Sequence, residues 1–97
     1  MDRDEARAVL AAELERYRSE SYHSLQRLLT TQDTCRVTGP SGTVYQLEIQ
    51  AVWDDGRPGN LRVMAMVDDG GWRALAPLTD DFIITPSGAP LPHSSGS

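Results

Sequence analysis

Lysine is absent from this chain, cysteine occurs once, and there is no long apolar run. A membrane-spanning helix needs about 20 mostly apolar residues and a signal peptide needs an apolar core, whereas residues 1–20 carry interspersed acidic and basic side chains from Asp2 onward. Cys35 has no second cysteine with which to form an internal disulfide, which is typical of a reducing compartment. We therefore expect a cytoplasmic protein that does not contact a membrane.

Positive charge is also scarce and is carried by arginine alone. Nine arginines, spread from Arg3 to Arg73, stand against fourteen aspartate and glutamate residues and leave a formal net charge of −5. Binding of a nucleic-acid backbone requires clustered cations that displace condensed counterions. The sequence therefore predicts an acidic protein that does not bind nucleic acid.

The N-terminal third has the apolar periodicity of an α-helix. Its apolar residues recur at steps of three and four, which places them on one helical face: Leu10, Leu14, Tyr17, Leu25, Leu28 and Leu29. The run Ser19-Glu20-Ser21 interrupts this stripe, and Ser21 is a suitable N-cap for a second helix from Tyr22 to Leu29. We expect either one kinked helix or two helices.

From residue 33 onward the apolar period changes to two, which indicates strands. The clearest strands are predicted at 43–53, 61–67 and 72–78. Shorter strands are predicted at 34–38, whose facing is ambiguous, and at 82–85 on an edge. Together these segments predict an antiparallel meander of four or five strands.

Turn chemistry sets the register of the three longer strands. Asp69-Gly70 is a dipeptide preferred in the two-residue type I′ turn, which would set Val67 opposite Trp72. If Trp53 lies opposite Leu61, the apolar residues of all three strands share one face, and a slip of one residue would move them into water. The helical stripe is the natural cover for that face.

The predicted fold class is therefore α+β. An N-terminal helical segment, one kinked helix or two, packs on one face of a four- to five-stranded antiparallel β meander. Residues 1–86 form a single α+β domain, and residues 87–97 are predicted to be a disordered C-terminal tail because they are rich in Pro, Gly and Ser.

Aspartate pairs follow each of the three longer predicted strands. In a meander the first and third pairs lie at the same end of the sheet and gather four carboxylates: Asp54, Asp55, Asp80 and Asp81. A hard cation such as Ca²⁺ binds such oxygens, but the ligand spacing of a dedicated calcium loop is absent. Bonds to the local backbone explain turn aspartates without any ligand, so no metal is predicted and these four residues stay an alternative metal site.

No catalytic constellation is present in the sequence. His23 and His93 share neither a helix nor a hairpin, and no specific base accompanies Cys35. Gly39-Pro40-Ser41-Gly42 lacks the Gly-Lys-Ser/Thr ending of a phosphate-binding loop and is interpreted as a turn. We therefore predict a protein that is not an enzyme and has no cofactor.

The second face of the predicted sheet carries an apolar strip framed by Gln, Glu and Arg. The register places Met64 beside Gln50 and Leu75, and it places Met66 beside Glu48 and Arg73. Glu48 by itself is interpreted as a solvated strand carboxylate. Met and Arg are both enriched at protein interfaces, so this face is predicted to bind a partner, unless the helical region or the C-terminal segment folds over it. The predicted partner-binding residues are Val52, Arg62, Met64, Met66, Arg73 and Leu75.

Several stretches carry a resemblance to known sequences. They are Gly39-Pro40-Ser41-Gly42-Thr43 with Tyr45, Glu48 and Trp53-Asp54, then Asp68-Asp69-Gly70-Gly71-Trp72-Arg73, and finally Pro77-Leu78-Thr79-Asp80. Over residues 20–85 the chain resembles a family of small uncharacterised bacterial proteins. The resemblance implies a bacterial, intracellular setting, and it transfers no catalytic or binding residue because the family has no assigned activity.

Two hypotheses of function follow from the sequence. The first is a small acidic, non-enzymatic domain that binds another protein, or a second copy of itself, through the second sheet face. The alternative is a domain that binds a small molecule or a metal ion, either in the cleft between helix and sheet or at the aspartate-rich loop end.

Overall fold

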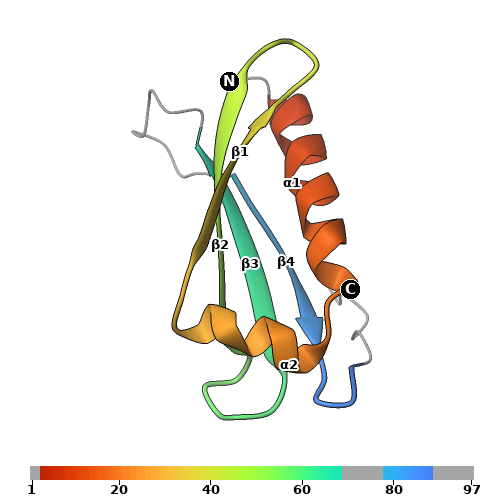
Figure 1. The fold of residues 1–97 in the computed structure, drawn as a ribbon, viewed down its shortest axis with the longest axis vertical. Coiled ribbons are helices and arrows are strands. Elements are labelled where there is room, and N and C mark those ends of the chain that lie inside the picture. Colours follow the sequence, from red (N-terminus) through yellow and green to blue (C-terminus); the bar gives the residue numbers. More distant parts are fainter. Residues whose placement is uncertain (1–2, 69–77, 89–97) are drawn as a thin grey trace.

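The computed structural model describes residues 3–68 and 78–88 of the chain. Two helical segments precede the sheet, and both lie on the same side of it (Figure 1). The elements are α1 (Arg3–Arg18), α2 (Tyr22–Leu25), the 3-10 helix η1 (Gln26–Leu29), β1 (Asp33–Thr38), β2 (Val44–Trp53), β3 (Leu61–Asp68) and β4 (Leu78–Ile84). This arrangement confirms the predicted α+β fold.

The helical segment divides into two helices at the predicted break. α1 ends at Arg18, and Ser21 has an extended backbone with its side-chain oxygen accepting a hydrogen bond from the Ser24 backbone N–H at 3.0 Å. This is the bond that an N-cap provides to the first turn of a helix. α2 therefore starts where the serine pattern predicts, and it continues as η1 to Leu29.

The described strands form one antiparallel sheet in the order β1-β2-β3-β4. The register of β2 with β3 is the predicted one, with Trp53 opposite Leu61 and Ile49 opposite Ala65. In β1, Cys35 lies opposite Leu47, so the half-buried side of this strand shares the face of the β2 core residues. That pairing settles the facing of the first strand.

The strand predicted at 72–78 is not the neighbour of β3, so the predicted pairing is wrong. β4 takes that place and sets Leu78, rather than Trp72, opposite Val67. Residues 72–77 lie outside the described part of the chain. The short edge strand predicted at 82–85 is the second half of β4, so the described sheet has four strands.

A polar residue on the core side of β4 breaks the apolar alternation by which a strand is recognised in the sequence. Asp80 lies opposite Ala65 but is exposed, which an edge strand permits. On either side of it Leu78, Phe82 and Ile84 are buried. These three side chains pack into the core beside β3, so hydrophobic burial stabilises the pairing with β4.

The core fills the layer between the helices and one face of the sheet. Its helical members are five of the six residues of the predicted stripe together with Ala6 and Val9, and Leu29 is only partly buried. Its strand members alternate along β2, β3 and β4. They are Ala6, Val9, Leu10, Leu14, Tyr17, Leu25, Leu28, Tyr45, Leu47, Ile49, Ala51, Leu61, Val63, Ala65, Val67, Leu78, Phe82 and Ile84.

Glu5 fastens the start of α1 to the turn between β1 and β2. Its carboxylate accepts hydrogen bonds from the hydroxyl of fully buried Tyr45 at 2.6 Å and from the Ser41 backbone N–H and hydroxyl, both at 2.7 Å. These bonds lower the pKa of Glu5, with the Tyr45 bond as the largest cause. A Cβ atom at Gly39 would lie 2.7 Å from the Glu5 Cδ atom, so a larger residue there would displace the carboxylate from these bonds.

We predict that Phe82→Ala destabilises the fold by about 3–5 kcal/mol, because a large buried ring is removed from the core. The Phe82 ring is 3% exposed, and the Arg18 guanidinium lies 5.0 Å from its centroid. The matched control is Thr79→Ala, an exposed residue of the same strand, which should change the free energy of unfolding by less than about 1 kcal/mol. Urea denaturation of both variants measures the difference, and equal small losses would contradict the place of β4.

Candidate functional site

The sheet face turned away from the helices is called the open face here. None of the side chains that the structure describes on this face is buried, whereas the β2 and β3 residues that alternate with them are almost all buried. It consists of Thr34, Arg36, Thr38, Val44, Gln46, Glu48, Gln50, Val52, Arg62, Met64, Met66, Thr79, Asp81 and Ile83. Both helices lie on the other side of the sheet (Figure 1).

The structure places four of the predicted partner-binding residues together on the open face. Val52, which is 40% exposed, lies opposite Arg62, and Met64 and Met66 follow along β3. Arg73 and Leu75 lie outside the described residues.

Their predicted positions beside the two methionines are wrong, because β4 occupies them. Asp81 lies opposite Met64, and Thr79 lies opposite Met66. Ile83 lies opposite Arg62 and extends the apolar strip onto β4. The sequence did not predict its part in this face, because the predicted edge strand began only at Phe82 and was not paired with β3.

Arg62 binds two aspartates at one end of the open face. Its guanidinium donates to Asp54 Oδ1 at 2.6 Å and to Asp81 Oδ2 at 2.7 Å. Each side chain is a quarter to a third exposed, so the bonds are partly shielded from water. The hydrogen bonds from Asp81 and then Asp54 raise the pKa of Arg62. The guanidinium is therefore the cation that these carboxylates hold.

The four aspartates considered as metal ligands do not form one cluster. Asp80 and Asp81 lie inside β4 and not at its end, because the strand begins at Leu78. Asp55 pairs with Arg57 at 3.5 Å, and Asp80 accepts a hydrogen bond from the Asp81 backbone N–H at 2.8 Å. Among residues 3–68 and 78–88, no group of three or more His, Cys, Asp or Glu side chains is placed to hold a metal ion.

Glu48 lies in the middle of the open face and is half-buried. It is opposite Thr34 of β1 and Met66 of β3. Within the described part of the chain its carboxylate forms no hydrogen bond or ion pair, and the Arg36 guanidinium on the neighbouring strand is not within ion-pair distance. The residues next to Glu48 on the open face are therefore mostly uncharged.

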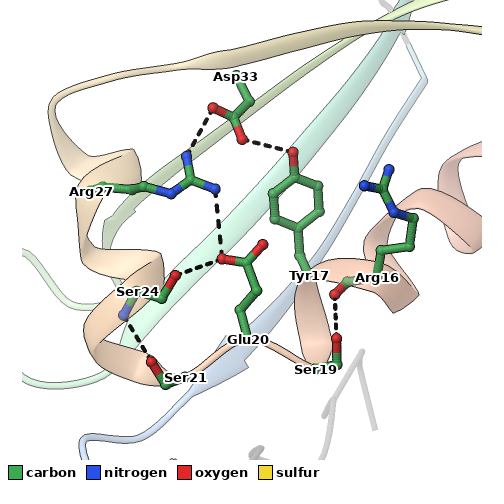
Figure 2. A network of polar contacts seen from close by, with 8 residues as sticks. All are labelled: Arg16, Tyr17, Ser19, Glu20, Ser21, Ser24, Arg27 and Asp33. Atoms are coloured by element: carbon green, nitrogen blue, oxygen red, sulfur yellow. Dashed lines mark hydrogen bonds and ion pairs between the residues drawn. The ribbon is translucent and has the colours of Figure 1, made fainter.

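A polar network joins the end of α1 to the start of β1, as Figure 2 shows. The Tyr17 hydroxyl donates to Asp33 Oδ2 at 2.8 Å, and Arg27 Nη1 donates to Asp33 Oδ1 at 2.9 Å. Glu20 accepts a hydrogen bond from the Ser24 hydroxyl at 2.7 Å and lies 3.6 Å from Arg27 Nη2. The network thus ties α1, α2, η1 and β1 to one another.

Charge and burial oppose each other within this network. The Arg27 hydrogen bond is the largest cause that lowers the pKa of Asp33, while burial acts in the other direction. Burial, followed by the hydrogen bond to Asp33, raises the pKa of Tyr17. Asp33 is therefore charged and Tyr17 neutral near pH 7. In these protonation states the tyrosine hydroxyl can donate a hydrogen bond and the carboxylate can accept it.

Cys35 has a carboxylate nearby that the sequence did not reveal. Its thiol lies 3.6 Å from Glu13 Oε2, and the same carboxylate pairs with Arg16. Burial, and next the negative charge of Glu13, raise the pKa of Cys35. A thiol needs a lowered pKa to be a good nucleophile near neutral pH, so this arrangement opposes nucleophilic chemistry at Cys35.

The layer between helices and sheet, the alternative ligand cleft, is filled with apolar side chains. The Tyr22 hydroxyl donates a hydrogen bond to the Gly59 carbonyl at 2.5 Å. In residues 3–68 and 78–88, every buried side-chain nitrogen or oxygen has a hydrogen-bond partner. This interior thus offers no unpaired polar atom to orient a small molecule.

Comparisons with known proteins assign no relative to this chain. A scan against protein-family models, a search of curated proteins and a search of solved structures each found no match. The resemblance to a family of small bacterial proteins therefore stays a prediction. In the described part of the chain, no helix is long and apolar enough to cross a bilayer.

We predict that Asp33→Asn lowers the free energy of unfolding at pH 7 by about 1 kcal/mol. The substitution removes the ion pair with Arg27 and leaves one acceptor oxygen for two donors, Tyr17 and Arg27. The folded-state pKa of Asp33 is below its unfolded value, so this stabilisation is present above about pH 4 and is lost as the pH falls through the folded pKa. Urea denaturation of wild type and variant between pH 7 and pH 3 should show the difference shrinking.

The matched control for this pH series is Asp55→Asn. The Asp55 side chain is 61% exposed and pairs with an exposed arginine, so its replacement should change stability by less than about 0.5 kcal/mol at every pH. A difference between wild type and Asp33→Asn that is as large at pH 3 as at pH 7 would contradict the ionic role of Asp33.

We also predict that the Cys35 thiol reacts with a disulfide reagent at pH 7.5 at least about tenfold more slowly than free cysteine, because its pKa is raised and it is half-buried. Unfolding in urea should bring the rate to that of free cysteine in the same urea solution. Stopped-flow absorbance measures both rates. A folded-state rate equal to that of free cysteine would show that Cys35 is an accessible, ordinary thiol.

Proposed function

We propose that this chain is a protein-interaction domain whose open face packs on another protein. Three of the predicted interface residues, Val52, Met64 and Met66, form an apolar strip that Ile83 extends. Among the described elements, the helices pack on the other face of the sheet. The observation that supports the proposal most is this strip of exposed and half-buried apolar side chains on one face of the sheet.

The open face combines a polar majority with an apolar strip. Solvated faces of antiparallel sheets are mostly polar, and nine of the fourteen open-face residues are polar. The two methionines and two arginines on this face belong to residue types that are enriched where proteins meet. Methionine side chains are flexible and polarisable, so they adapt to a partner surface. The face also carries Gln46, Gln50 and Arg62, which provide the polar contacts of an interface rim.

We assign the open face to a basic partner and not to a second copy of the chain. The formal net charge is −5, so two copies repel each other, whereas a basic protein is attracted and binds at a higher rate. The proposed activity is therefore recognition of a protein with a positively charged surface.

The test uses Met64→Lys, which places a charge in the middle of the apolar strip. The new ammonium group is opposite Asp81, so the variant should still fold, as a thermal melt can verify. Ala12→Lys is the matched control, because it adds the same charge on the exposed side of α1. Affinity chromatography from the extract of the source cell, with quantification by mass spectrometry, compares the three proteins.

We expect basic proteins bound in stoichiometric amounts by wild type and Ala12→Lys, and at least about tenfold less by Met64→Lys. Equal recovery by all three would contradict an interface on the open face. Light scattering of wild type at several concentrations completes the experiment. A dimer that Met64→Lys dissociates would make a second copy the occupant and would overturn the assignment to a basic partner.

A further inference from the structure

Glu48 differs from the other glutamates in the described part of the chain. Glu5 binds the turn between β1 and β2, Glu13 and Glu15 pair with arginines of α1, and Glu20 binds Ser24 and Arg27. Glu48 is half-buried on a central strand and has none of these bonds. Its negative charge is therefore stabilised by water and not by the protein.

Docking of a partner on the open face would remove this water. Met66 lies directly opposite Glu48, and Met64 is the next residue of β3 on the same face. A partner that packs on these methionines also covers the carboxylate between them and β1. An ionised carboxylate that loses water without gaining a hydrogen-bond donor is strongly destabilised, so an interface here needs a donor at Glu48.

We propose that Glu48 receives the arginine or lysine side chain of the partner protein. The cation restores the hydrogen bonds that the carboxylate loses, while its aliphatic stem packs on Met64 and Met66. A partner with a neutral or acidic side chain at this position leaves the buried charge unpaired and is rejected. This inference rests on the proposed function and names the chemical group that the open face selects.

The remaining charged groups of the open face support a cation from outside. Arg62 is held by Asp54 and Asp81 and is 33% exposed, so it is already paired. Arg36 is exposed on the edge strand β1, where it lies opposite Gln46, two residues from Glu48 along β2. In a homodimer the partner's copy of Arg36 could reach Glu48, but the net charge of both copies opposes that assembly.

Peptides selected from a random phage-displayed library provide a defined probe. Selection on immobilised wild-type protein, with excess Met64→Lys protein as competitor, retains peptides that need the open face. Each selected peptide is then synthesised with its arginines replaced one at a time by citrulline, or its lysines by acetyl-lysine. Calorimetry measures the dissociation constants with wild type, Glu48→Gln and the exposed control Glu15→Gln.

We expect each peptide to contain one cationic side chain that pairs with Glu48. Its replacement should weaken binding to wild type and to Glu15→Gln by at least about tenfold, and binding to Glu48→Gln by less than about twofold. Such a double-mutant cycle assigns the coupling to this one pair of groups. Equal losses with wild type and Glu48→Gln would overturn the proposal. Thermal melts should place the stability of Glu48→Gln close to that of wild type, because the carboxylate has no intramolecular bond to lose.

The outcomes also separate this inference from the proposed function. One outcome is a peptide that does not bind Met64→Lys, binds Glu48→Gln as tightly as wild type and needs no cation. This outcome would contradict the role of Glu48 and would still support the open face as an interface. A library that yields no peptide able to distinguish wild type from Met64→Lys would contradict both.

Discussion

The register of β2 with β3 is the constraint on which both faces of this sheet depend. Leu47 opposite Val67 and Ile49 opposite Ala65 send four side chains into the helical layer. A slip of one residue would exchange the two faces and place the methionines against the helices. Core packing therefore fixes the open face as well, although no open-face residue belongs to the core.

Two polar anchors hold the helical layer to this sheet from opposite ends of α1. Glu5 in the first turn binds the loop between β1 and β2, and Tyr17 in the last turn binds Asp33 at the start of β1. Both anchors act on the β1–β2 hairpin, so the edge strand is held at its beginning and just beyond its end. Both bonds therefore hold the β1–β2 hairpin, which carries Glu48 on its other face, against the helical layer.

Elements with a local signal could be predicted from the sequence. The break at Ser21 followed from the interrupted apolar stripe and a capping side chain, and the β2–β3 register followed from strict alternation. β4 could not be placed, because Asp80 breaks the alternation and is tolerated only at an edge strand. The bonds from Arg62 to its two aspartates and from Cys35 to Glu13 join residues distant in sequence, so only the folded chain reveals them.

The unpaired carboxylate of Glu48 has opposite consequences in the free and bound states. While the face is exposed, water solvates Glu48, and its charge lies beside the apolar strip, opposite Met66, which limits indiscriminate association. In the proposed complex the Glu48 carboxylate loses its water and needs a cation from the partner. A complex with a partner that has no cation at this position is destabilised by the unpaired charge. A single residue on a central strand can therefore both discourage wrong contacts and define the right one, because burial changes the environment of its charge.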